Sequence, residues 1–149
     1  MRRSPWTAVA VVAVVTALAG ACGSGDSDRA RDLAHEACAT YEMFAPAGLV
    51  TAEDRETVRG RVVPALEDSA RLAAQAARLD SDWRELALGL ARLAEQTSAR
   101  LDLADLQAAA TPTSDGADGA DGADELQARV LNLGGEVDAH DPRAQCRKA

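Results

Sequence analysis

Apolar side chains recur at helical spacing in four separate segments of the chain, and this pattern constrains the fold more than any other feature of the sequence. The clearest case lies in residues 83–101, where apolar positions step by three or four and share one helix face. Alternation of the kind that indicates a β-strand is absent outside the N-terminal 21 residues. The sequence therefore predicts an all-α fold, an up-down four-helix bundle. The stripe of the third helix consists of Trp83, Leu86, Leu90, Leu93, Thr97 and Leu101, and Leu103 and Leu106 continue it toward Ala110.

Two helices are predicted before this stripe. The first covers residues 29–45 and ends at Pro46, and the second covers residues 52–79 after Thr51 as its N-cap. Pro64 removes a backbone hydrogen bond inside the second helix, so we expect a kink or break near residues 61–63. The inward-facing positions are Ala34, Ala37, Cys38, Tyr41 and either Phe44 or Ala45 in the first helix, and Val58, Val62, Leu66, Ala70, Ala73 and Ala77 in the second.

The third helix is predicted to begin after a turn at residues 80–82, so that three helices occupy residues 29–110. A repeated Asp-Gly-Ala segment then predicts a flexible linker over residues 111–124, because it holds nothing large and apolar to bury. Its carboxylates come every third residue, a spacing that does not fit an EF-hand calcium loop.

A fourth helix and a tail are predicted over residues 125–149, with two glycines, Gly134 and Gly135, weakening the helix. A three-helix core with a loosely docked fourth helix is therefore the alternative architecture. The inward-facing positions of the fourth helix are Leu126, Val130, Leu133 and Val137.

The N-terminal 21 residues have the three parts of a signal peptide: Arg2 and Arg3, an uncharged apolar stretch, and small residues before Cys22. The stretch is shorter than the ~20 apolar residues of a transmembrane helix. The run Leu18-Ala19-Gly20-Ala21-Cys22 resembles the lipobox of bacterial lipoprotein precursors, in which the cysteine thiol receives a diacylglyceryl group. The resemblance implies a lipid anchor at Cys22 on the extracytoplasmic face of the cell membrane, and a flexible tether is predicted over residues 22–28.

An alternative processing route stays open. Leu18 lies four residues before the cysteine, whereas the usual lipobox places leucine three residues before it. Residues 19–21, Ala-Gly-Ala, also satisfy the rule for ordinary secretory cleavage, which would release a secreted protein. Heavy use of Ala, Arg and Asp, with a single Lys, resembles the coding bias of high-GC bacteria, notably actinobacteria. With its lipobox-like run, the chain resembles the small helical lipoproteins of that group.

The three cysteines favour the lipid anchor. If Cys22 carries lipid, Cys38 and Cys146 remain as an even pair in a compartment where disulfides persist. Such a bridge would constrain the unfolded chain by ~4 to 5 kcal/mol in the loop-entropy model. The alternative for the same residues is a zinc or copper site in which His35 and His140 join the two cysteines. The spacing between His140 and Cys146 matches no standard metal-binding knuckle, and the disulfide is favoured.

Charge and motif content bound the function. Residues 22–149 hold all 24 acidic residues and 14 of the 16 basic ones, a formal charge of −10 that argues against nucleic acid as a partner. No nucleophile turn, phosphate loop or zinc-helix motif is present, so we expect no enzyme activity, no catalytic residue and no cofactor. We expect a non-enzymatic envelope module that is attached to the membrane through its lipid. Its partner is expected to be an envelope protein or the cell wall. A lipoprotein that binds a metal or small ligand for uptake or sensing is the alternative.

Overall fold

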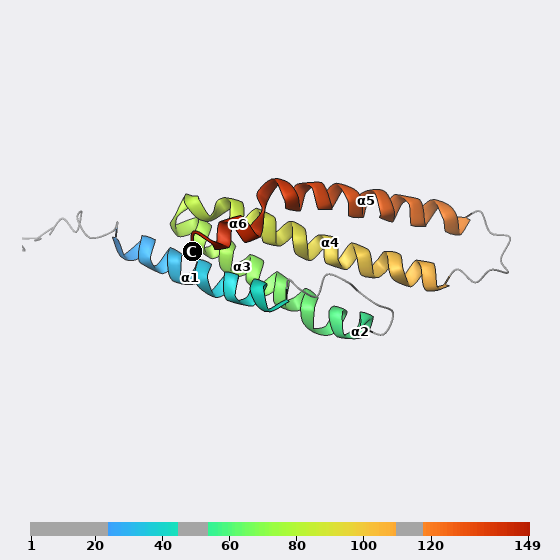
Figure 1. Ribbon diagram of the computed structural model, residues 1–149, viewed down its shortest axis with the longest axis horizontal. Helices are drawn as coiled ribbons and strands as arrows, with labels where there is room; N and C mark the ends of the chain where they lie inside the picture. The colour runs from blue at the N-terminus through green and yellow to red at the C-terminus, as the bar shows by residue number, and fades with distance from the viewer. Residues whose placement is uncertain (1–23, 45–53, 110–117) are drawn as a thin grey trace, which may run out of the picture.

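The chain folds into antiparallel helices, as the sequence predicts (Figure 1). A computed structural model describes residues 24–44, 54–109 and 118–149, and these residues contain helices and no strand. The all-α class and the four-helix bundle are thereby confirmed. The elements are α1 (Ser24–Phe44), α2 (Arg55–Thr57), a π-helical segment η2 (Val58–Val62), α3 (Val63–Leu79), a 3-10 turn η3 (Ser81–Trp83), α4 (Arg84–Ala109), α5 (Asp118–His140) and α6 (Pro142–Cys146).

The helices pack in chain order: α1 against α3, α3 against α4, and α4 against α5. Figure 1 shows α1 and α4 running away from the end where the C-terminus lies, and α3 and α5 running back towards it. The short helix α6 then turns across the bundle and contacts both α4 and α1. The C-terminal segment therefore joins the first helix of the bundle to the last.

The apolar core lies between α1, α3 and α4. Its fully buried side chains are small on α1 and larger on α4, where Leu86, Leu90 and Leu101 are almost inaccessible. None of the described side chains of α5 belongs to this core, although Leu133 is buried against α4. The fourth helix thus completes the bundle from outside a three-helix core, which combines features of the two predicted architectures. The smallest core positions on α1 and α3 are Ala30, Ala34, Ala37, Ala73 and Ala76, all fully buried.

The predicted apolar stripes of the first three helices face inward, whereas of the four positions predicted for the fourth helix only Leu133 is buried. Of the first six stripe positions of the third predicted helix, only Leu93 and Thr97 are half-buried and the others are buried. The predicted continuation of the stripe is wrong at Leu106, which is exposed, and Leu103 is half-buried. In the second predicted helix Ala70 and Ala77 are half-buried and the other four positions are buried. Asp80 caps the turn into α4, because its side chain accepts a hydrogen bond from the Asp82 backbone N–H at 3.0 Å.

Pro64 interrupts the second helix without breaking it. Residues Val58–Val62 form the π-helical segment, and the backbone N–H of Val63, which directly precedes the proline, bonds to the Val58 carbonyl. Proline has no backbone N–H to donate and sits at the start of α3, where helices tolerate it. The wider turn accommodates the missing donor and carries the chain from α2 into α3 as one continuous rod.

Three predicted boundaries are wrong. Residues 24–28 were expected in a tether, but they form the first turns of α1, and side chains 25–29 are exposed. Residues 118–124 were expected in the linker, but they form the start of α5. The tail beyond Asp141 forms α6, because Asp141 accepts a hydrogen bond from the Ala144 backbone N–H at 3.1 Å. Residues 111–117 and 1–23 lie outside the described part of the chain.

Candidate functional site

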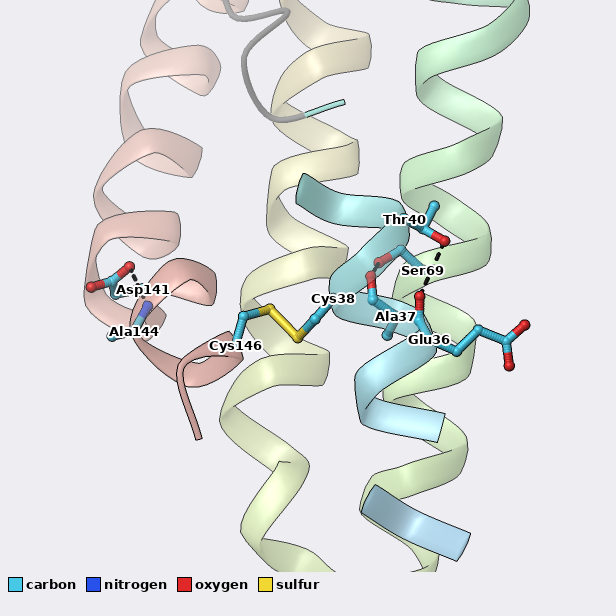
Figure 2. Close-up of a disulfide and its surroundings, with 8 residues drawn as sticks. All are labelled: Glu36, Ala37, Cys38, Thr40, Ser69, Asp141, Ala144 and Cys146. Carbon is cyan, nitrogen blue, oxygen red and sulfur yellow. Dashed lines mark hydrogen bonds between the residues drawn. A yellow bond between two sulfur atoms is a disulfide. The ribbon is translucent and has the colours of Figure 1, made fainter. Parts of the chain in front are cut away.

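The C-terminal segment crosses the bundle at a disulfide between Cys38 of α1 and Cys146 of α6 (Figure 2). The two sulfur atoms lie 2.10 Å apart and the Cα atoms 5.5 Å apart, which is the separation of a bonded pair. The predicted pairing of these cysteines is confirmed. Cys38 is buried and Cys146 half-buried, so the bridge is part of the packed interior. The predicted lipidation site, Cys22, lies outside the described residues.

The position of Cys38 depends on the close packing of α1 against α3. Ser69 of α3 is fully buried and donates a hydrogen bond from its hydroxyl to the Ala37 carbonyl at 2.6 Å. Figure 2 shows Ser69 next to the turn of α1 that carries the disulfide. Because the neighbouring positions on both helices are alanines, the backbones approach closely and the hydroxyl reaches across. The apolar stripe did not reveal Ser69, since it is polar.

The histidines do not complete a metal site with the cysteines. His35 is exposed on α1, whereas Cys38 on the same helix is buried and already bonded to Cys146. His140 at the end of α5 instead pairs through Nδ1 with a carboxylate oxygen of Glu85 at 2.6 Å. Within residues 24–44, 54–109 and 118–149, no group of three or more His, Cys, Asp or Glu side chains is placed to hold a metal ion. The structure therefore does not bring together the alternative set of His35, His140 and the two cysteines.

Two surface pockets flank the C-terminal segment. One, of about 410 Å³, lies between Tyr41 of α1 and the α5–α6 corner, where Val137, Asp138 and Arg143 contribute to its wall. The other, of about 360 Å³, lies where the start of α1, the α3–α4 turn and the tail meet, and it is lined by charged side chains around Trp83. Both pockets have volumes at the lower end of the range for small-ligand sites.

Polar side chains of α4 bond to α5. Arg92 of α4 bonds to Glu95 at 2.8 Å and to Glu136 of α5 at 2.6 Å, and these two carboxylates raise the pKa of Arg92. The buried amide of Gln96 faces the backbone of α5 near Gly134. With its oxygen turned towards α5, this amide accepts hydrogen bonds from the Gly134 N–H at 3.1 Å and from Arg100 at 3.2 Å. Spacing along one helix could not predict these contacts, because their partners lie on the next helix.

A second polar cluster lies near the C-terminal end of α4. Arg59 of η2 bonds to Asp105 at 2.8 Å and to Asp102 at 3.4 Å, and Arg55 donates to the Ala104 carbonyl at 2.9 Å. These side chains are exposed or half-buried, so the ion pairs contribute little to stability individually. They fix the register of the first turns of the second helix against α4.

No protein-family model, curated protein or solved structure matches this chain. Within the described residues, no helix is both long enough and apolar enough to cross a membrane.

Proposed function

We propose that this chain is a lipid-anchored extracytoplasmic protein whose helical bundle serves as a non-enzymatic interaction module of the cell envelope. The observation that carries the proposal is the Cys38–Cys146 disulfide. Cytosolic thiols are kept reduced, so a buried structural disulfide supports an exported protein. The bridge accounts for two of the three cysteines of the sequence, and the third, Cys22, stands in the position that the lipobox-like run requires.

The interior of the bundle supports a binding role rather than catalysis. Every buried side-chain nitrogen or oxygen of the described residues has a hydrogen-bond partner. Catalytic sites usually contain convergent polar groups in a pocket, with acid–base groups whose pKa values are displaced by burial. Here each of the two pockets beside the C-terminal segment has exposed charged side chains in its wall, and this polar surface is suited to contact with a partner.

Metabolic labelling with an alkyne fatty acid tests the anchor. The wild-type chain, expressed in a bacterium that processes lipoproteins, should incorporate the label and remain in the membrane fraction. Cys22→Ala should lose both the label and the membrane association. Cys38→Ala with Cys146→Ala is the matched control, and it should keep the label. An unlabelled wild-type chain in the medium would instead establish the secreted form.

Intact mass and elemental analysis separate the proposal from the metal-binding alternative. Protein produced in an oxidising compartment should lack two hydrogens relative to the reduced chain and should contain no stoichiometric zinc or copper. Free thiols at Cys38 and Cys146 with bound metal would overturn the assignment of these residues to a structural bridge.

A further inference from the structure

Three segments distant in sequence meet at one end of the bundle. The start of α1, the α3–α4 turn and the C-terminal tail share a pocket lined by Ser27, Arg31, Asp80, Asp82, Trp83 and Lys148. Figure 1 shows this end opposite α2 and the start of α5. We call residues 25–31, 78–85 and 147–149 the anchor end, because α1 begins at Ser24, two residues after Cys22.

The anchor end differs in charge from the remainder of the molecule. It holds six basic and five acidic side chains, so its formal charge is +1. The remainder of residues 22–149 holds eight basic and 19 acidic side chains, a formal charge of −11. The net negative charge of residues 22–149 therefore comes from side chains outside the anchor end.

The distances make this asymmetry effective at a membrane. Two residues span at most ~7 Å, so a lipid on Cys22 would hold the start of α1 next to the headgroups. The helix extends ~30 Å from there, at 1.5 Å per residue. Charges are screened over ~8 Å at physiological ionic strength. A bundle lying flat on an anionic bilayer would bring part of the acidic remainder within this distance of the headgroups. An upright bundle would keep most of that remainder farther away.

We infer that the anchor end is a membrane-facing surface whose partner is the layer of anionic phospholipid headgroups, and that the acidic remainder projects away from the bilayer. This inference rests on the proposed lipid anchor at Cys22. Six basic side chains at this end interact with lipid phosphates, and the five carboxylates among them keep the attraction weak. Attachment comes from the acyl chains, and the charge distribution sets the orientation.

Energy transfer from tryptophan to a dansyl-labelled lipid measures the orientation. Trp83 is the only tryptophan in residues 22–149, and it lies at the anchor end. In a chain that begins at Cys22, the thiol of this cysteine can be coupled to a maleimide lipid, because the other two cysteines form the disulfide. Vesicles of phosphatidylcholine with phosphatidylglycerol serve as the bilayer.

The comparison is with a tryptophan at the opposite end of α4. Trp83→Phe combined with Leu106→Trp moves the fluorophore along the helix by ~35 Å, at 1.5 Å per residue. We expect several-fold greater transfer from residue 83 than from residue 106. We also expect transfer from residue 106 to increase when phosphatidylglycerol is omitted or salt is raised, since both weaken the repulsion. Equal transfer from the two positions, or no dependence of residue 106 on lipid charge, would overturn the inference.

Neutron reflectometry of the wild-type chain on a supported bilayer gives a second measurement that needs no substitution. An upright bundle forms a protein layer about as thick as the long axis of the molecule, and a flat bundle forms a layer about as thick as its short axis. Because the lipid is coupled chemically in both experiments, their outcome is independent of lipidation in cells. Failure of the fatty-acid labelling would overturn the proposed function, whereas a flat layer would overturn the orientation alone.

Discussion

Gly89 of α4 faces Pro142 of α6 so closely that a β-carbon at residue 89 would lie 2.8 Å from the Pro142 Cγ atom. A β-carbon at residue 89 would also lie 3.2 Å from the His140 Cβ atom. Both neighbours are parts of the chain that cannot rotate away, so the absence of a side chain at Gly89 allows α5 to end and α6 to begin against α4. This contact places Cys146 within reach of Cys38.

We therefore expect Gly89→Ala to lower the free energy of unfolding by about 1 to 3 kcal/mol, the usual cost of overpacking. Chemical denaturation monitored by circular dichroism measures the change. Gly135→Ala is the matched control, because nothing lies within 4 Å of a β-carbon there. It should stabilise the protein by about 0.5 to 1 kcal/mol through helix propensity. Destabilisation at Gly135 equal to that at Gly89 would show that contact with Pro142 is not the cause.

Removal of the disulfide should destabilise the bundle strongly. The bridge joins residues 108 positions apart, so its loss releases almost the whole chain from a covalent constraint. For Cys38→Ala with Cys146→Ala we expect a loss of about 2 to 5 kcal/mol in the free energy of unfolding. Urea denaturation provides the measurement, and Cys22→Ser with the bridge intact is the control. An unchanged denaturation midpoint would contradict a stabilising role.

The buried hydroxyl of Ser69 gives a sharper test of the α1–α3 contact. Ser69→Ala removes the 2.6 Å hydrogen bond to the Ala37 carbonyl and should cost about 1 kcal/mol. Thr40→Ala removes a hydroxyl hydrogen bond to the Glu36 carbonyl on the exposed side of α1 and should change the free energy of unfolding by less than about 0.5 kcal/mol. Thermal denaturation of the two variants side by side measures the difference. Equal effects would place Ser69 outside the stabilising contacts.

Hydrogen exchange should distinguish α5 from the other long helices. No described side chain of α5 belongs to the apolar core, and polar contacts with Arg92 and Gln96 join this helix to α4. We expect amides of α5 between residues 122 and 133 to exchange faster than those of α3 and the first half of α4, because local opening there exposes little apolar surface. Exchange followed by mass spectrometry of peptides reads this out. Uniform protection across the four helices would mean that α5 unfolds only with the core.

The apolar pattern predicted the fold because burial and helical periodicity act on the same residues. Leu86 and Leu90 recur on one face of α4, and the structure buries both. The start of α5 was missed for the opposite reason: Gly119 and Gly122 disfavour helix locally, and the acidic residues that favour a helix N-terminus do so only once a helix is present. Local composition does not contain that context.

Of the candidate site, the number of cysteines in the sequence predicted only the disulfide. An odd cysteine near the N-terminus left Cys38 and Cys146 as a pair, and the structure bonds them. The partner of His140 could not be predicted, because Glu85 lies 55 residues away and meets it only through the packing of α5 on α4. The same holds for Gln96 and Gly134, whose contact depends on how closely two helices approach.

The bridge between Cys38 and Cys146 closes most of the described helices into one covalent ring. A protease that cuts the backbone once anywhere between these two residues would leave two fragments that stay joined through sulfur. If Cys22 carries lipid, the C-terminal fragment would remain attached to the membrane after such a cut. After such a cut, release from the cell surface would need a thiol reductant, a second cut inside the ring, or a cut between Cys22 and Cys38.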